Sequence, residues 1–241
     1  MNEVNQTKAT QKLFDKENFK NDWRKLMTNW TEEQLEEYAV KMEKKYSTIK
    51  RGDNVVHLDY FGGLLNDNDI SEIENLLSKN NLELSRFDKS GIPYASVDDF
   101  ILQVALFLSD KTTQDVLIGL TSSALWDTIK TTTFYMWQTV RNRTQTIMTA
   151  RTTKQRKINC GLKLSLDKNT KFEFKIDGEL SEETALKSLD KVLDFMKTIK
   201  PNPTIKHADF VIFNTEKDIW EIVDVNAEMQ KKMMEQKANE K

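Results

Sequence analysis

Strict alternation of apolar and polar residues from position 158 to position 176 constrains the fold of this 241-residue chain more than any other feature. Two alternating runs are separated by a polar stretch, 167–170. Successive side chains of a strand point to opposite faces, so the pattern predicts a β-hairpin with one buried face. The apolar positions are Ile158, Cys160, Leu162, Leu164, Leu166, Phe172, Phe174 and Ile176.

The residues after this hairpin continue the same unit. Ser181 begins a helix that ends before Pro201, and a second hairpin is expected from strands at 210–213 and 219–225. The helix should pack across the sheet through one apolar side, which carries Leu189, Val192 and Met196. Residues 157–226 are therefore predicted to form a ββαββ domain.

The first part of the chain predicts helices followed by a small βαβ unit. Residues 1–50 form a helical segment in which Thr31-Glu-Glu-Gln34 is a capping box. In residues 54–95, alternating apolar and polar residues predict a short strand, apolar residues at helical spacing predict a helix, and a second short strand follows. Residues 96–150 read as a helical core segment, capped at Ser96 and containing a long apolar helix. The fold class predicted for the whole chain is α+β.

Composition narrows the class of protein. Seven glycines and three prolines in 241 residues predict few tight turns and long helices. The single cysteine, Cys160, excludes a disulfide framework and a cysteine zinc site. The first residues contain no apolar stretch of signal-peptide length, so we expect a cytoplasmic protein. Residues 227–241 read as a charged helix or tail.

Motifs for metal, nucleophile and phosphate chemistry are missing: HExxH, GxSxG, GxGxxG and a phosphate loop ending in GK[ST] do not occur. The sequence therefore predicts no cofactor, no metal and, for the leading hypothesis, no catalytic residue. Asp167 followed by Glu173-Phe-Lys175 has the residue types of a metal-dependent nuclease on a hairpin. A turn for Asp167 and the solvent face for Glu173 and Lys175 explain the same pattern.

The spacing of Arg51 and His57 resembles the Arg-x4-6-His motif of HEPN ribonucleases. This resemblance implies a nuclease in which Arg51, His57 and the neighbouring Asp59 would act in catalysis. The family places its motif in helices, whereas His57 falls in a predicted strand, VVHLDY. A metal-dependent or HEPN-like nuclease is therefore the alternative to a non-enzymatic function.

Charge is distributed unevenly along the chain. Eight Lys and Arg residues and no Asp or Glu lie between Thr128 and Leu166, so this segment carries +8. Because the whole chain has a net charge of −2, the remainder carries −10. Arginine suits phosphate and carboxylate ligands. The candidate binding residues are Arg141, Arg143, Arg151, Lys154, Arg156 and Lys157.

Several interpretations fit this basic segment. The alternatives are a solvated helix end without a partner, a docking surface for an acidic protein, and a site for nucleic acid or anionic lipid. The apolar stretch 116–140 is long enough to cross a bilayer, which makes a membrane-associated effector a further alternative. Asp127, Lys130 and Gln138 count against a spanning helix and favour a close crossing inside a core.

The order of a short βαβ unit, an apolar helix VLIGLTSSALWDTIK, a basic stretch and the hairpin and helix GLKLSLDKNTKFEFKIDGELSEETALKSLDKVLDFM resembles effector-associated accessory domains of bacterial conflict and antiphage systems. The resemblance covers residues 54–199. It implies a bacterial adaptor that binds a partner effector protein, with a role in antiviral defence. Such a protein needs no active site of its own, which agrees with the missing motifs.

Overall fold

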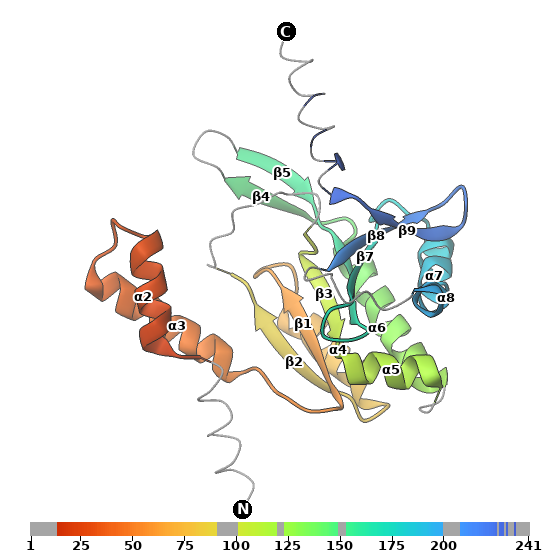
Figure 1. Ribbon diagram of the computed structural model, residues 1–241, viewed down its shortest axis with the longest axis horizontal. Helices are drawn as coiled ribbons and strands as arrows, with labels where there is room; N and C mark the ends of the chain where they lie inside the picture. Colours follow the sequence, from red (N-terminus) through yellow and green to blue (C-terminus); the bar gives the residue numbers. More distant parts are fainter. Residues whose placement is uncertain are drawn as a thin grey trace, which may run out of the picture.

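A computed structural model describes residues 14–90, 101–119, 123–148, 153–199, 208–225, 227–228, 230 and 234. Its centre is a mixed seven-stranded sheet with the order β2-β1-β3-β6-β7-β8-β9 (Figure 1). The strands are β1 (Val55–Tyr60), β2 (Glu83–Asp88), β3 (Val104–Leu108), β6 (Cys160–Ser165), β7 (Lys171–Ile176), β8 (Asp209–Asn214) and β9 (Ile219–Val223). Helices and strands together place the chain in the α+β class, as the sequence predicts.

The predicted βαβ unit is confirmed. Strands β1 and β2 are parallel, and α4 (Asp67–Ser78) connects them. Asn66 caps α4, because its side chain accepts a hydrogen bond from the backbone N–H of Asp69, whose carboxylate accepts one in return from the N–H of Asn66. Ile70, Ile73 and Leu77 bury the apolar side of the helix against the sheet.

The order of strands and helix predicted for the C-terminal unit is also confirmed, with one difference, but its strands belong to the same sheet as β1, β2 and β3. Strands β6 and β7 form the antiparallel hairpin, and β8 and β9 form the second one. The single predicted helix is two, α7 (Glu182–Asp190) and α8 (Val192–Thr198), which meet at Lys191. Ser181 caps α7 as expected. Leu189, Val192 and Met196 are buried in the same core as the apolar positions of the first hairpin.

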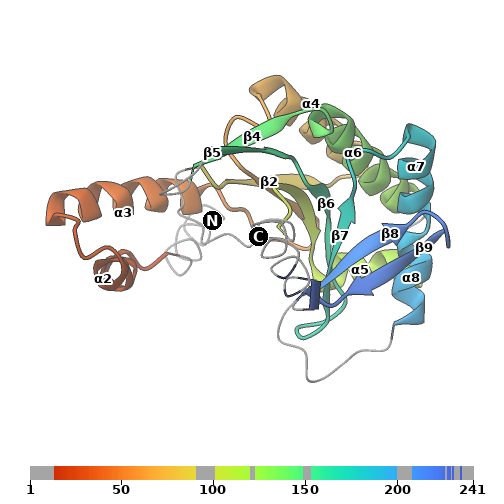
Figure 2. The same ribbon diagram turned by 90° about the horizontal axis from the view of Figure 1, so that it is seen from above.

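A layer of helices covers one face of the sheet (Figure 2). They are α4, α5 (Asp110–Ile118), α6 (Ser123–Val140), α7 and α8. Trp137 of α6 is fully buried beneath them, and its indole N–H donates to the carbonyl of Asp177 at 2.9 Å. This apolar layer joins the strand units into one core.

Two predictions for 96–150 are wrong. The run expected to continue a helix through Val104 and Phe107 is β3, a central strand. The long apolar helix is two shorter ones, because the chain turns at Gly119, where φ is +71°, between α5 and α6. A left-handed residue ends a helix, and glycine adopts this conformation without a Cβ clash. The cap expected at Ser96 lies outside the described residues.

The N-terminal helices form a hairpin that extends away from the sheet (Figures 1 and 2), here called the arm, residues 16–47. It consists of α2 (Lys16–Leu26) and α3 (Glu32–Ser47), and the predicted capping box at Thr31 and Gln34 is present. Only the C-terminal end of α3 meets the sheet. There Lys45 donates to the carbonyl of Asp88 at 2.8 Å.

The basic segment contains a short antiparallel ribbon that the sequence did not predict. Strands β4 (Thr144–Met148) and β5 (Thr153–Lys157) pair separately from the main sheet. The ribbon follows α6 directly and leads back into β6 through two buried residues, Ile158 and Asn159. We call β4 and β5 together the basic ribbon.

Candidate functional site

A pocket of about 350 Å³ lies where the end of α3 meets the sheet face opposite the helical layer. Residues that pair across strands share a face, and the register aligns His57 of β1 with Phe107 of β3, and Phe107 with Lys163 of β6. We call it the ring pocket, because four of its side chains carry rings. Its lining is Tyr46, Ile49, His57, Asp59, Phe87, Phe107 and Lys163.

His57 is the polar ring of this pocket. It is half-buried and lies 5.9 Å from the ring of Phe107, centroid to centroid. Burial holds the pKa of His57 below its ordinary value, the charge of Asp59 opposes this shift, and Arg51 adds to it. The imidazole is therefore neutral at pH 7. Neither of its nitrogens forms a hydrogen bond with the described part of the chain.

The charged side chains of the ring pocket already have partners. Asp59 pairs with Lys89 at 2.8 Å, and Lys163 pairs with Glu173 at 3.0 Å. Neutral His57 and the hydroxyl of Tyr46 are thus the polar groups that remain open to a ligand. A lining of rings with two neutral hydrogen-bonding groups suits binding of a small uncharged group better than proton transfer between charged partners.

The structure brings together the three residues of the nuclease hypothesis. His57 and Asp59 lie on the same face of β1, and exposed Arg51 precedes the strand closely enough to influence the imidazole. The strand setting of His57 differs from the helical one of HEPN ribonucleases. Sequence reasoning missed the other lining residues, because Phe107 was assigned to a helix and the strand order was unknown.

The described residues offer neither a metal site nor a reactive cysteine. No group of three or more His, Cys, Asp or Glu side chains there could hold a metal ion. Cys160 is fully buried in β6, and burial raises the pKa of its thiol to about 12. The thiol therefore stays protonated at neutral pH and is a poor nucleophile.

The first two candidate binding residues of the basic segment have internal partners. The guanidinium of Arg141 lies 4.3 Å from the ring centroid of Trp137 and 3.5 Å from the carboxylate of Glu182. Arg143 donates to the carbonyl of Leu64 and pairs with Asp69 at 3.5 Å. Both side chains thus help to fix the end of α6, which reduces the charge they can offer to a partner.

The remaining basic candidates lie in or beside the basic ribbon. Lys157 ends β5 and pairs with Glu179. In the strand register Arg156 lies opposite Gln145, and Lys154 lies opposite Ile147. Arg151 lies outside the described residues. A docking role for this ribbon stays a prediction.

The arm presents an aromatic surface that sequence analysis did not single out. Its rings and that of Phe14, just before α2, contact one another in a continuous set in which Tyr38 is buried and the others are partly exposed: Phe14, Phe19, Trp23, Trp30, Tyr38 and Tyr46. No side chain of α2 is fully buried, and Leu26 at its end is 71% exposed. In the sequence, this surface is indicated by apolar residues at helical spacing: Phe19, Trp23, Leu26, Met27 and Trp30. Such spacing predicts an amphipathic helix but does not show what covers its apolar face.

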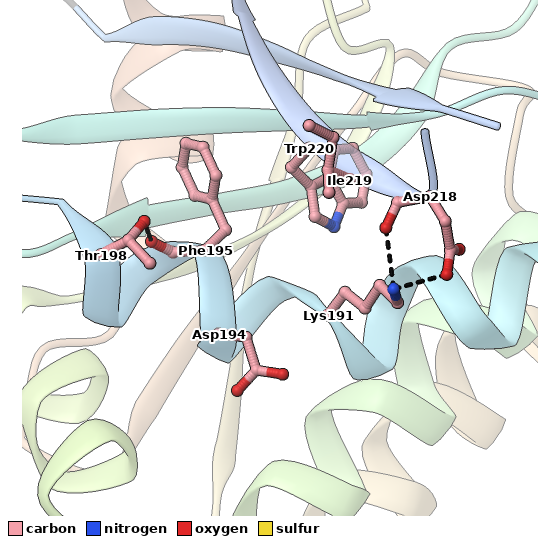
Figure 3. Close-up of a pocket in the computed structure, with 7 residues that line it drawn as sticks. All are labelled: Lys191, Asp194, Phe195, Thr198, Asp218, Ile219 and Trp220. Atoms are coloured by element: carbon pink, nitrogen blue, oxygen red, sulfur yellow. Dashed lines mark hydrogen bonds and ion pairs between the residues drawn. The ribbon is translucent and has the colours of Figure 1, made fainter. Parts of the chain in front are cut away.

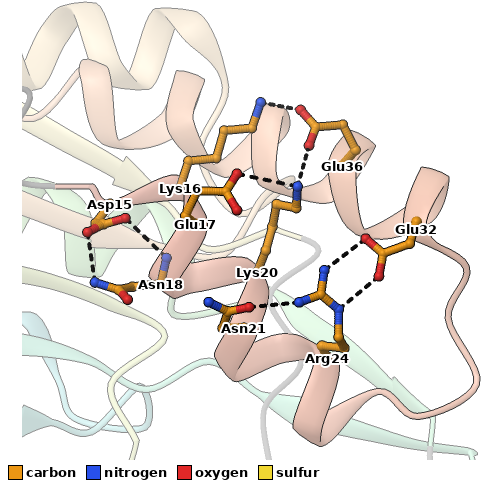
Figure 4. Close-up of polar contacts among 9 residues, drawn as sticks. All are labelled: Asp15, Lys16, Glu17, Asn18, Lys20, Asn21, Arg24, Glu32 and Glu36. Atoms are coloured by element: carbon orange, nitrogen blue, oxygen red, sulfur yellow. Dashed lines mark hydrogen bonds and ion pairs between the residues drawn. The ribbon is translucent and has the colours of Figure 1, made fainter.

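Ion pairs hold α2 on α3 along the exposed side of the arm (Figure 4). Arg24 donates two hydrogen bonds to Glu32, each 2.8 Å long. Glu36 accepts from Lys16 and, at 2.9 Å, from Lys20. Both helices are therefore joined at their surface by charge and beneath it by rings.

Neither the fold nor the sequence has a counterpart among the proteins compared. No family model matches the chain, and searches of curated proteins and of solved structures found no similar protein. In the described part of the chain, no helix has the length and apolar character needed to cross a bilayer.

Proposed function

We propose that this protein is a non-enzymatic adaptor that binds a partner protein through its arm. The observation that carries the proposal is the exposure of α2 in the arm. The amphipathic helix α2 leaves every apolar side chain at least partly exposed, on an element that touches the sheet only at the end of α3. Leu26, at 71% exposure, marks the most accessible point.

The residue types of the arm support a protein partner. Tryptophan, tyrosine and phenylalanine supply large contact areas and are enriched at protein interfaces. A partner with an apolar patch would bury the half-exposed faces of Phe19, Trp23 and Met27. Burial of apolar area then provides the free energy of binding.

The likeness to accessory domains supports an effector as the partner and bacterial defence as the setting. In that arrangement the basic segment would add a second, charge-dependent contact. Such rim charges affect the rate of association and its salt dependence more than the final affinity. We therefore assign the main binding energy to the arm.

The test starts with affinity purification of the full chain from its native host, followed by production of the captured protein and direct titration. Leu26→Arg should weaken binding at least tenfold, because a charge would be buried in an apolar contact. Ile118→Arg is the matched control: Ile118 is 65% exposed on α5, away from the arm. Equal affinity of the Leu26→Arg variant and the wild type would refute the proposal.

The same preparation tests the non-enzymatic part of the proposal. His57→Ala should leave affinity for the partner unchanged, since His57 lies in the ring pocket and not on α2. Wild-type protein should not cleave generic DNA or RNA. Cleavage that His57→Ala abolishes in a folded protein would establish the nuclease alternative instead.

A further inference from the structure

The last strand of the sheet leaves an unpaired edge. Strand β9 ends the strand order and pairs, within the described residues, with β8 alone. Every second residue of an edge strand directs its backbone N–H and C=O away from the sheet. These groups can be satisfied by water or by another extended chain. An α-helix cannot satisfy them, because its backbone groups bond internally.

The sequence of this edge lacks the usual protection against strand pairing. Its five residues, IWEIV, include no lysine, arginine or proline. Ile219 is 47% exposed and Ile222 is 49% exposed, so both faces of the edge carry accessible apolar side chains. Glu221, the charged residue of these five, pairs with Lys217 at 2.8 Å.

A groove runs beside this edge, between β9 and α8 (Figure 3). Its volume is about 320 Å³, and we call it the edge groove. The rings of Phe195 and Trp220 form its apolar part. They are held by edge-on contacts to Phe174, at centroid distances of 5.4 and 5.1 Å, and the indole N–H of Trp220 donates to the carbonyl of Ser188 at 2.8 Å. The groove therefore has fixed walls.

Charged side chains lie at one end of the edge groove. Lys191 donates to the carbonyl of Asp218 at 2.8 Å and to its carboxylate at 2.5 Å. Lys187 pairs with the same carboxylate at 2.9 Å. Two lysines share one carboxylate, so this end of the groove carries a net positive charge, and the apolar surface for an incoming side chain lies beside it at Phe195 and Trp220.

We propose that β9 and the edge groove bind an extended segment of a partner protein, which adds an eighth strand to the sheet and places a large apolar side chain between Phe195 and Trp220. In this mode backbone hydrogen bonds supply affinity, and a pocket beside the edge selects the side chain. The partner segment would be recognised by alternating apolar residues. This surface lies at the opposite end of the sheet from β2 and the arm, so it is a second docking surface beyond the proposed function.

A second copy of the chain fits the edge less well than a foreign strand. Symmetric antiparallel pairing centred on the middle residue of β9 would place Glu221 directly opposite Glu221 of the other copy. Like charges at directly opposed positions destabilise a strand pair. A foreign segment can instead place an apolar or basic residue there.

The test uses blocked peptides and the full chain. The probe is Lys-Thr-Val-Thr-Phe-Thr-Val-Thr-Lys, compared with a version that has Asp for Phe and with one N-methylated at alternate residues. We expect the Phe peptide to bind and to protect β9 amides from hydrogen exchange. The Asp peptide should bind at least tenfold more weakly, and N-methylation should abolish binding, because it removes the donors of one strand edge.

Variants locate the site and separate it from the arm. Ile219→Lys should weaken peptide binding at least tenfold, whereas Leu186→Lys, on α7 at 38% exposure, should leave it unchanged. Leu26→Arg should also leave it unchanged, so failure at the arm and failure at β9 are distinguishable. The proposal is overturned by a Kd above about 1 mM for the Phe peptide, by equal binding of the N-methylated peptide, or by protection of β9 through self-association alone.

Discussion

The arm and the sheet are stabilised by different interactions, although both are rich in aromatic residues. In the sheet, Phe172 and Phe174 are almost completely buried, with rings of Phe195 and Trp220 packed edge-on against them. In the arm, α2 buries no side chain fully, and it is joined to α3 by ion pairs and by ring contacts to Tyr38, one of four buried side chains of α3. Buried apolar area contributes far more free energy than exposed charge pairs. The arm should therefore open locally while the sheet stays folded, as binding elements often do.

The largest expected effect comes from removing one ring in each region. Phe174→Ala should lower the free energy of unfolding by about 3–5 kcal/mol, because it leaves a cavity in the core. Trp23→Ala should expose the amides of α2 to exchange and leave the denaturation midpoint of the sheet unchanged. Chemical denaturation and hydrogen exchange measure the two responses. A loss of sheet stability in the Trp23→Ala variant comparable to that in Phe174→Ala would show that arm and sheet unfold together.

Matched helix caps sharpen the comparison at a smaller scale. Thr31→Ala removes the capping box of α3, and Asn66→Ala removes that of α4. Each change should cost about 1 kcal/mol. We expect the cost of Thr31→Ala to appear as faster exchange in the arm, and that of Asn66→Ala as lower global stability. Identical exchange patterns for both variants would contradict independent opening of the arm.

The smallest effect is a response to acid. Hydrogen bonds from Arg24 hold the pKa of Glu32 below its ordinary value, and those from Lys16 and Lys20 do the same for Glu36. A lowered carboxyl pKa contributes stability that is complete above the unfolded-state pKa, about 4.3, and is lost as the pH falls through the folded-state pKa. The arm should loosen below about pH 4.3.

Indole resonances provide the measurement. Signals of Trp23 and Trp30 in the arm should move toward unfolded positions at acid pH, while those of Trp137 and Trp220, whose side chains are buried and donate to backbone carbonyls, should persist. Glu36→Gln should weaken the pH response of the arm. Simultaneous loss of all four signals would assign the acid effect to the sheet instead.

The two edge strands of the sheet, β2 and β9, also differ in how their residues are exposed. At β2, Glu83 and Arg86 are charged and exposed. The segment after α3 lies against this edge, where the hydroxyl of Thr48 donates to the carbonyl of Arg86 and the backbone N–H of Lys50 donates to the hydroxyl of Ser85. At β9 the edge residues are mostly apolar and open. A single sheet thus has one edge protected against pairing and one edge available for it.

The sequence by itself determined the elements whose signals are local. Alternation defines a strand through the geometry of its own backbone, and caps at Thr31 and Ser181 depend on hydrogen bonds within three residues, so the hairpins and these helix starts were predicted correctly. Tertiary structure decided the rest. The apolar run 104–108 fits a buried helix or a buried strand, and only pairing with β1 and β6 selects the strand. The ring pocket needed that same register, because its residues come from α3, the segment after it and four strands, which meet only when the sheet has formed.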